Sequence, residues 1–434
     1  MEKPQRGRSK LEDRQVARHP MMSQIEFADL DSWETPAVVR QIVVVGGGPA
    51  AQRCVLELRE IGFTGSVTLV SSESIWPYDG ILLSKDHPED KTASFAPMAG
   101  LDFCGERGVE LLLGRKAVAL DPVTRCVELA DGAELTYDRL VLAVGGTPVL
   151  PRSLAAPGVL TMWTAADVGS VRRALERSGR VVVIGAGLLG VEIAAAAIAA
   201  GCCVTLVEAK SVPLEPVLGE EVGRLVGDLH ASHGVDLRCG VSADRVTATA
   251  DEYRVELADG TVLWSDSVIV CVGTRPAVDW LHSSGIAIDL AIMTDAECRT
   301  SLPGVLAAGA CAQWWDCRVG DYCGVEHWDT AGDHGAAAAR AALGRPAAFN
   351  PISFFRSHQY GVKFQWAANA SRWDKVKING QSCTDFSAGY FDGEYLVGAF
   401  VANRPKEFGA LKHQLVKESK FAGPGKGTSL AMAE

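Results

Sequence analysis

The sequence has no long apolar run: no window of 18 residues is both apolar and free of charge, so we expect no membrane-spanning helix. Residues 1–37 are charged and show no apolar periodicity. They lack the apolar core of a secretory signal peptide, and their acidic residues argue against a mitochondrial presequence. We therefore expect a disordered extension at residues 1–37 and a flexible tail at residues 421–434, on a soluble protein of the cytoplasm.

Excess basic charge, disulfide patterns and metal-ligand spacings are also missing. The 42 Lys and Arg residues are outnumbered by 53 Asp and Glu residues, and the net charge of −11 argues against a nucleic-acid partner. Twelve cysteines in 434 residues are too few and too irregularly spaced for a disulfide scaffold, which favours a reducing compartment. No spacing of His or Cys residues matches a zinc or iron–sulfur site, so we expect no metal.

The sequence does contain a globular composition with bunched glycines. Apolar residues make up 47% and charged residues 22%, which is enough apolar material for a packed core. A chain of 434 residues is too long for one compact domain and predicts about three. Many of the 45 glycines stand in short runs beside apolar stretches, and two of these runs carry a recognisable pattern.

The first run follows an apolar strand predicted at Ile42–Val45. Gly46, Gly48 and Ala51 form a G-x-G-x-x-A pattern, and a helix is predicted after it. In this setting the first glycine makes a tight turn, the second lets a pyrophosphate approach the backbone, and the small third residue allows close helix packing. Glu73, just after the next predicted strand, is the acid available to an adenosine ribose.

The pattern recurs 139 residues later, after a strand predicted at Val181–Ile184. Its three glycines are Gly185, Gly187 and Gly190. The strand after the following helix ends at Glu208, where an acid binds the 2′-hydroxyl of an adenosine ribose and repels a 2′-phosphate. This acid favours NADH over NADPH, although the nearby Lys210 weakens the preference.

Two such patterns in one chain predict an α/β fold with two Rossmann-like dinucleotide-binding domains. One copy alone would be weak, because a plain glycine turn can have the same spacing. Two copies, each with a strand, a helix and a second strand, are poorly explained by coincidence. One domain would hold a resident FAD and the other an exchanging NAD(P)H, so that hydride passes from the nicotinamide to the flavin.

Further segments resemble the FAD-dependent NAD(P)H reductases of the pyridine nucleotide-disulfide oxidoreductase superfamily, and within it the putidaredoxin- and rhodocoxin-type ferredoxin reductases. Those enzymes serve cytochromes P450 and Rieske oxygenases. The similarity covers about residues 40–415. The matching segments are PYDGILLSK (77–85), LVLAVGGTP (140–148), SVIVCVGTRP (267–276), RTSLPGVLAAGACA (299–312), VEHWDTAGDHG (325–335), FFRSHQYGVKFQ (354–365) and FVANRP (400–405).

The resemblance implies roles for individual residues. Lys85 matches the lysine near flavin N5, and Glu192 matches the glutamate beside the nicotinamide, a catalytic pair that places hydride donor and acceptor. The stretch that caps the flavin and lines the nicotinamide entry is matched by Glu326, His327 and Trp328. The remaining cofactor-binding residues expected from the matching segments are Gly145, Gly273, Gly309 and Ala310.

Three expected flavin contacts depart from the family pattern. Gly80 and Thr147 stand where arginines are usual, and Ala310 replaces an aspartate that accepts a ribityl hydroxyl. Each lost charge-assisted hydrogen bond typically costs about 1.5–3 kcal/mol, so these departures are expected to weaken FAD binding unless other groups compensate. Two alternatives therefore stay open: another flavoenzyme on the same frame (an oxidase, a nitrite-reductase-like component or a biosynthetic enzyme), and a non-catalytic nucleotide-binding or redox-sensing protein.

The cysteines match neither dithiol pattern of the superfamily. The helix after the first glycine turn carries only Cys54 instead of C-x4-C, and the second domain has no C-x-x-C, so a disulfide-reductase mechanism is not expected. Cys311, Cys317 and Cys323 are evenly spaced near the expected flavin. We expect them to be structural, with a redox role as the alternative.

The chain is expected to contain a first FAD-binding segment (38–152), an NAD-binding domain (153–270), a second FAD-binding segment (271–346) and a C-terminal α/β domain (347–420), in that order. Residues 351–434 contain eleven Lys and Arg against seven Asp and Glu. Such a positive region would attract an acidic ferredoxin. We expect NADH to reduce FAD, and single electrons to pass to a ferredoxin-type iron–sulfur carrier.

Overall fold

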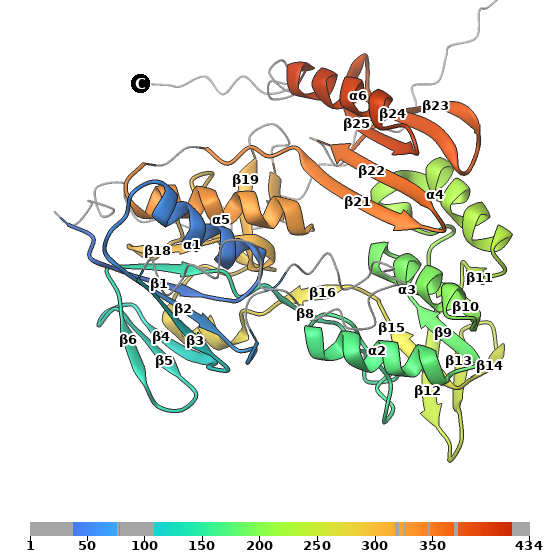
Figure 1. Ribbon diagram of the computed structural model, residues 1–434, viewed down its shortest axis with the longest axis horizontal. Coiled ribbons are helices and arrows are strands. Elements are labelled where there is room, and N and C mark those ends of the chain that lie inside the picture. The colour runs from blue at the N-terminus through green and yellow to red at the C-terminus, as the bar shows by residue number, and fades with distance from the viewer. Residues whose placement is uncertain are drawn as a thin grey trace, which may run out of the picture.

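The computed structural model of the protein describes residues 38–75, 78, 108–316, 321–324, 327–345, 348–368 and 372–418. These residues form two regions built on parallel sheets and a carboxyl-terminal region built on an antiparallel sheet (Figure 1). The antiparallel sheet lies above helices α3 and α4 of the second parallel region in the view of Figure 1. The predicted extension (1–37) and tail (421–434) lie outside the described residues.

The first parallel sheet has five strands in the order β18-β7-β1-β2-β3. Its inner strands are buried along nearly their whole length, which fits a sheet covered on both faces. The strands are β1 (Gln41–Val45), β2 (Ser66–Ser71), β3 (Val109–Leu113), β7 (Arg139–Leu142) and β18 (Val305–Ala307).

Helix α1 (Pro49–Glu60) follows β1 and packs along helix α5 (Trp328–Ala342) (Figure 1). The helices approach closely at Gly335, where a Cβ atom would overlap the carbonyl oxygen of Ala50. Two small sheets and two 3-10 helices complete this region: β4 (Ala117–Asp121), β5 (Cys126–Leu129) and β6 (Glu134–Thr136); β17 (Ile292–Thr294), β19 (Ala312–Asp316) and β20 (Asp321–Gly324); η4 (Asp279–Ser284) and η5 (Gly309–Cys311).

The second parallel sheet has four strands in the order β11-β10-β9-β15. Its strands are β9 (Arg180–Ile184), β10 (Cys203–Glu208), β11 (Asp236–Cys239) and β15 (Ser267–Val270), with helices α2 (Ala165–Arg177), α3 (Leu188–Ala199) and α4 (Glu215–Ser232). An antiparallel sheet of β12 (Ala243–Ala248), β13 (Tyr253–Leu257) and β14 (Val262–Ser265) is attached to it. Both predicted strand–turn–helix units are therefore present, one in each parallel region.

The chain leaves and re-enters the first region at one place. Strand β8 (Gly146–Pro148) pairs antiparallel with β16 (Thr274–Pro276), so the outgoing and returning segments run side by side. Strand β18, which follows this return, then completes the first parallel sheet beside β7. The second parallel region is thus inserted into the first.

The carboxyl-terminal region has a five-stranded antiparallel sheet in the order β21-β22-β25-β24-β23, with one helix against it. Its elements are β21 (Ser353–Gln359), β22 (Val362–Ala368), β23 (Lys375–Ser382), β24 (Asp385–Asp392), β25 (Tyr395–Ala402) and α6 (Pro405–Glu418). Alternate residues of β21 are buried, so one face of this strand turns inward.

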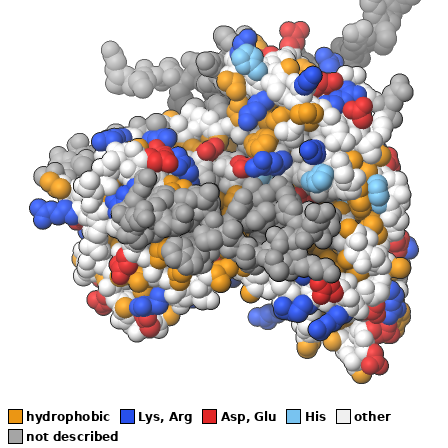
Figure 2. All heavy atoms as spheres, viewed as in Figure 1, with side chains coloured by type: hydrophobic (Ala, Val, Ile, Leu, Met, Phe, Trp, Pro, Cys, Tyr) orange, Lys and Arg blue, Asp and Glu red, His pale blue; other side chains and the backbone are white. Residues whose placement is uncertain are grey.

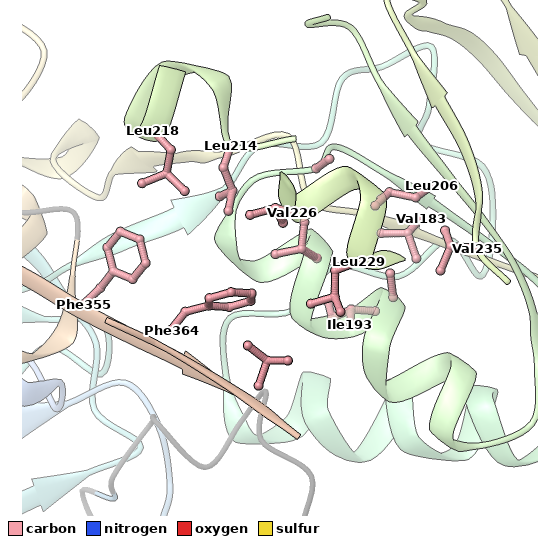
Figure 3. Packing of buried hydrophobic residues seen from close by; sticks show 14 of the residues in the cluster. Val183, Ile193, Leu206, Leu214, Leu218, Val226, Leu229, Val235, Phe355 and Phe364 are labelled. Carbon is pink, nitrogen blue, oxygen red and sulfur yellow. The ribbon is translucent and has the colours of Figure 1, made fainter. Parts of the chain in front are cut away.

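The second parallel region and the antiparallel sheet share one apolar core. Ile193 of α3 and Val226 of α4 belong to the same buried cluster as Phe355 and Phe364 of the antiparallel sheet (Figure 3). Burial of apolar surface is the main force that holds packed elements together. The shared core therefore fixes β21 against α3 and α4, which brings distant polar residues into contact.

None of the helices in the described ranges combines the length and the apolar character that a bilayer crossing requires.

Candidate dinucleotide and redox site

The first glycine turn has the geometry of a phosphate cradle. Gly46 has a φ of +138°, and a Cβ atom there would overlap the carbonyl oxygen of Ala143, so only glycine fits. Gly48 is the N-cap of α1, and among the described residues, its own chain neighbours aside, no atom lies within 4 Å of the position that its Cβ would take. This open space at the N-terminus of α1 is what a pyrophosphate bound by the helix N–H groups requires. Ala51 is fully buried beneath the turn.

Gln52, which the sequence reasoning missed, holds this turn in place. Its side chain is fully buried, and Nε2 donates hydrogen bonds to the carbonyl oxygens of Gly47 (2.8 Å) and Tyr78 (3.2 Å). Its Oε1 is buried and has no partner among the described residues. An unpaired buried acceptor beside an open helix N-terminus fits a ligand hydroxyl or a bound water.

Glu73 lies half-buried just beyond the end of β2, where the sequence predicts an acid. Its carboxylate accepts a hydrogen bond from the hydroxyl of Tyr78 (3.1 Å), and that hydroxyl accepts one from the backbone N–H of Ala165 (2.9 Å). Burial and the neighbouring carboxylate raise the pKa of Tyr78, so the hydroxyl remains a donor. Tyr78 thus links Glu73 to helix α2, and the contact of Glu73 with a ribose stays a prediction.

The other residues expected on the flavin side lie next to or within strand β8 and in the 3-10 helix η5 of the first region. Gly145 has a φ of +66° and open space around its Cβ position. Thr147 sits on β8 opposite Arg275, and its Oγ1 is buried without a partner among the described residues. Gly309 and Ala310 form η5 together with Cys311. Thr147 therefore offers a hydroxyl group where the resemblance implies an arginine, and Ala310 offers a methyl group where it implies an aspartate.

His334 supports the Gly309–Ala310 segment from α5. Its Nδ1 accepts a hydrogen bond from the backbone N–H of Gly309 (3.2 Å), and its ring stacks on Phe349 with a centroid distance of 4.3 Å. Burial lowers the pKa of His334 to about 3, so the ring is neutral at physiological pH. The histidine therefore fixes the backbone next to Ala310 without adding charge.

The second glycine turn repeats the geometry of the first. Gly185 has a φ of +99°, and a Cβ there would overlap the carbonyl oxygen of Cys271. Gly187 is the N-cap of α3 with open space around its Cβ position. A Cβ at Gly190 would overlap the carbonyl oxygen of Gly185, which forces glycine at the third position. Gly273, with a φ of +110°, lies in open space where the chain returns from β15.

Glu208 lies at the end of β10 and reaches the second turn. Its Oε2 accepts a hydrogen bond from the backbone N–H of Ala186 (2.6 Å), and its Oε1 accepts one from the backbone N–H of Lys210 (2.8 Å). Ala186 is the residue between the first two glycines of the pattern. The carboxylate is thereby held at the mouth of the turn, where the sequence predicts a ribose contact.

Strand β21 brings together residues predicted in different regions of the chain. The inward-facing Phe355 and Ser357 are two positions apart and therefore lie on one face of the strand. Ser357 donates a hydrogen bond from Oγ to Oε1 of Glu192 (2.6 Å), and Glu192 is only 7% exposed. The ring of Phe355 lies 6.0 Å from the ring of His327.

His327 and Trp328 begin helix α5. His327 is the N-cap residue, and its Nδ1 accepts a hydrogen bond from the backbone N–H of Asp329 (3.4 Å). Because Glu192 contacts Ser357 and His327 contacts Phe355, the start of α3 and the start of α5 both lie against the inward face of β21. Lys85, Glu326, Gly80 and Cys317 lie outside the described residues, so their predicted roles stay predictions.

The described cysteines are all free thiols. Of the three for which a structural role is predicted, Cys311 is buried, Cys323 is half-buried and Cys317 lies outside the described residues. Cys311 is fully buried, and burial raises its pKa to about 11. Burial raises the pKa of Cys54 on α1 to about 12. A thiol of raised pKa is a poor nucleophile, so neither group is suited to disulfide exchange. In the described ranges, no three His, Cys, Asp or Glu side chains are grouped as a metal site would need.

The two turns fit the two dinucleotides that the sequence predicts. Each has a helix N-terminus that opens onto free space at its second glycine, and the first also has two buried oxygen atoms, of Gln52 and Thr147, without partners among the described residues. These features suit phosphates and hydroxyl groups. The site is therefore chemically suited to one dinucleotide at each turn.

A family model described as pyridine nucleotide-disulphide oxidoreductase matches residues 40–335. The chain belongs to this family. Two curated relatives cover most of its length. The ferredoxin reductase subunit of 5,5′-dehydrodivanillate O-demethylase from Sphingobium sp. is 34% identical over 84% of this chain and 90% of its own. Putidaredoxin reductase of Pseudomonas putida is 30% identical over 86% of this chain and 90% of its own.

A solved structure supports the same assignment within the pyridine nucleotide-disulphide oxidoreductase family. The crystal structure of the covalent putidaredoxin reductase–putidaredoxin complex superposes with a TM-score of 0.83 at 28% identity, over 89% of this chain and 96% of that chain. The predicted family resemblance and the predicted α/β fold with two Rossmann-like domains are both confirmed.

Proposed function

We propose that this protein is an FAD-dependent oxidoreductase that takes hydride from NADH and delivers single electrons to a ferredoxin-type iron–sulfur protein. The observation that carries the proposal is the pair of equivalent glycine turns, with the carboxylate of Glu192 held beside the second turn by the C-terminal sheet. The relatives named for ferredoxin reduction support the choice of acceptor.

The first turn would hold FAD, and the second would hold the exchanging nicotinamide nucleotide. Gly46, Gly48 and the N–H groups of α1 would carry the flavin pyrophosphate, while Gly145, Gly309 and Ala310 would lie along its remaining length. Bound FAD would supply the conversion of a two-electron donor into single-electron steps. Because the expected arginine and aspartate contacts are missing, FAD would be held by the backbone and by neutral side chains such as Gln52 and Thr147.

The role proposed for Glu192 is to orient the nicotinamide. Its buried carboxylate is held through Oε1 by Ser357 and lies one turn into α3, close to the open end of that helix. A fixed carboxylate of this kind restricts the poses that the nicotinamide ring can take. Lys85 is proposed as its cationic partner, and Glu326, His327 and Trp328 as the residues that line the entry.

The proposed preference for NADH rests on Glu208. Its carboxylate is already held at the mouth of the second turn by two backbone N–H groups, so a 2′-phosphate would meet a fixed negative charge. Lys210 follows closely and is exposed, which leaves NADPH as a weaker substrate. A cytoplasmic location is proposed on the free state of the described cysteines.

The electron acceptor is proposed to dock near the C-terminal sheet, whose surface carries both signs of charge. Figure 2 shows Lys and Arg side chains interspersed with Asp and Glu side chains over this region of the molecule. Lys363 and Lys375 are among its exposed basic residues. Such residues would attract an acidic ferredoxin, and salt would weaken that attraction.

The test is an anaerobic absorbance titration of the purified protein, first with NADH and then with NADPH. A flavin spectrum that bleaches at lower NADH than NADPH concentration is expected. Addition of an oxidised [2Fe–2S] ferredoxin should then restore the flavin spectrum and reduce the iron–sulfur protein. A colourless protein that takes up no added FAD would overturn the proposal, and fast oxygen consumption without ferredoxin reduction would point to an oxidase.

A further inference from the structure

Five polar side chains form a continuous buried network that leads from the surface to Glu192. The hydroxyl of Tyr360 lies 2.9 Å from Nδ1 of His230, whose Nε2 lies 2.9 Å from Oε1 of Gln359. Nε2 of Gln359 donates to Oγ of Ser357 (2.9 Å), and that hydroxyl donates to Oε1 of Glu192. We call these five residues the Glu192 network. Two of them come from helices α3 and α4, two from β21, and Tyr360 from the turn that follows β21.

The carboxylate at one end fixes the direction of every hydrogen bond in the network. An ionised carboxylate only accepts, so Ser357 must donate to Glu192 and must accept from the amide of Gln359. The oxygen of that amide then faces His230, which must donate from Nε2. The free Nδ1 of His230 can only accept, so the hydroxyl of Tyr360 donates to it. All four donors therefore point toward Glu192.

The side chains that lead to Glu192 are electrically neutral, and the three in the middle of the network are buried. Ser357 is 4% exposed, Gln359 is 1% exposed and His230 is fully buried. Burial lowers the pKa of His230 to about 4, so the ring has one N–H group at physiological pH, as the direction of the network requires. Aligned dipoles strengthen one another in such surroundings, and their positive ends all face the carboxylate.

Tyr360 adopts a backbone conformation that its hydroxyl contact helps to explain. It occupies the two-residue turn between β21 and β22 with a φ of +51°, a left-handed conformation that is unfavourable for a bulky side chain. Its ring stacks on His233 with a centroid distance of 4.0 Å, and its hydroxyl meets His230. A strained backbone conformation of this kind persists only where contacts of the side chain offset its cost, and the contacts with His233 and His230 do so here.

We propose that Ser357, Gln359, His230 and Tyr360 are positioning residues for Glu192, which hold its carboxylate in one orientation for the nicotinamide. The inference rests on the role of Glu192 under the proposed function. An amide such as that of Gln359 does not readily pass protons on, so the network orients and stabilises the charge and does not conduct a proton. The apolar core that the C-terminal sheet shares with α3 holds this network against Glu192, so the sheet would complete the nicotinamide site.

The first test is the rate of flavin reduction by NADH in rapid mixing. Ser357→Ala should lower the limiting rate about tenfold, the loss expected for one hydrogen bond to a charge, with a smaller change in half-saturating NADH. Ser357→Thr, which restores a hydroxyl, should recover most of the rate. Tyr360→Phe, at the exposed end of the network, should cost less than threefold. The matched control is Ser387→Ala, a buried serine of the same sheet that lies outside the network.

A double-mutant cycle separates positioning from general stability. If the network acts through Glu192, Ser357→Ala should add no further loss in a Glu192→Ala background. A further loss of about tenfold in that background would overturn the proposal, because the serine would then act independently of the carboxylate. An unchanged rate in Ser357→Ala itself would also overturn it.

The second test needs no cofactor. Nitrogen-15 NMR of labelled histidine, with the His230 signals assigned by their loss in His230→Gln, reports which ring nitrogen carries the proton. We expect a neutral ring protonated at Nε2 at pH 7. Protonation at Nδ1 would reverse the deduced direction and overturn the network. Should the unmodified protein fail to take up FAD, the proposed function would fail while this measurement still decided the network.

Discussion

The two glycine turns are nearly the same in backbone geometry. The N-cap glycines have φ and ψ of −77° and −176° at Gly48, and −71° and −178° at Gly187. The first glycine of each turn donates a 2.8 Å hydrogen bond to the end of the neighbouring strand, from Gly46 to Val70 and from Gly185 to Val207. The same sequence pattern, set beside an equivalent neighbouring strand, thus produces the same cradle twice.

What differs is the element that packs against the helix after each turn. Helix α1 packs against α5 of the same region, through the close approach of Gly335 to Ala50. Helix α3 packs against β21 of the C-terminal sheet, which shares a core with α3 and reaches Glu192. The acids differ too, since Glu208 contacts its turn while Glu73 contacts Tyr78.

The largest expected effect is a loss of stability at acidic pH, because each of the two parallel regions buries one neutral histidine. Burial lowers the pKa of His334 to about 3 and that of His230 to about 4, while an unfolded histidine takes up its proton near pH 6.5. Between these values the unfolded chain binds more protons, so the free energy of unfolding should fall as the pH drops from 6.5 toward 4, by on the order of 3 kcal/mol for each histidine.

Urea denaturation between pH 7 and pH 4 measures this loss. His334→Gln and His230→Gln should each flatten the pH dependence, and an unchanged m-value in each variant is the control that the same surface unfolds. A free energy of unfolding that falls with pH below 6.5 as steeply in both variants as in the unmodified protein would contradict the prediction that the two rings are neutral in the folded protein.

A second prediction concerns the third position of the two glycine patterns. A Cβ at Gly190 would overlap the carbonyl oxygen of Gly185, so Gly190→Ala should lower the free energy of unfolding by about 3 kcal/mol. Ala51→Gly is the matched change in the other turn; it removes one buried methyl group and should cost about 1 kcal/mol. Calorimetric unfolding of both variants measures the difference. Equal losses would mean that the two helices pack on their turns in the same way.

The glycine turns could be predicted because the strand–turn–helix pattern has a characteristic spacing. Only the need for glycine at Gly190 is local, since its Cβ would overlap the carbonyl oxygen of Gly185, whereas Gly46 and Gly185 are required by the distant carbonyl groups of Ala143 and Cys271. The residue-level assignments at Glu192 and His327 came from the resemblance, and the structure brings both to β21. Lys85 and Glu326 remain predictions.

The Glu192 network could not be predicted, because its members are far apart in the sequence. Ser357 is 165 residues from Glu192, and Gln359 is 129 residues from His230. Their meeting depends on how the C-terminal sheet packs on α3 and α4, and no spacing rule encodes that packing. A partial signal existed in the alternation of FFRSHQ, whose inward positions carry Ser357 and Gln359 among aromatic residues. Polar residues at inward positions of a strand require partners.

A third prediction separates cofactor binding from folding. Within the described residues, apart from the adjacent positions in the chain, no atom lies within 4 Å of a Cβ at Gly187 or Gly48, and neither has a positive φ, so alanine at either position is expected to fit the folded protein. Gly187→Ala should leave the melting temperature unchanged and weaken NADH binding at least tenfold, because the methyl group occupies the path of the pyrophosphate. Gly48→Ala should do the same to FAD and leave the second turn intact. Fluorescence titrations with each cofactor measure binding, and a thermal melt measures stability. If Gly187→Ala weakened FAD binding and Gly48→Ala weakened NADH binding, our assignment of the two turns would be reversed.

The smallest expected effect concerns the two acids. Glu208→Gln keeps the shape of the side chain and removes the charge held by Ala186 and Lys210, so NADH binding should weaken only a few-fold while binding of NADPH improves. The expected result is a preference for NADH that falls by about a factor of ten, measured as the ratio of kcat/KM for the two nucleotides. Glu73→Gln is the control, because its carboxylate contacts Tyr78 on the flavin side and should leave that ratio unchanged. A ratio that moves with Glu73 and is unaffected by Glu208 would mean that the two acids serve the opposite nucleotides, and would remove the electrostatic basis for the proposed choice of NADH.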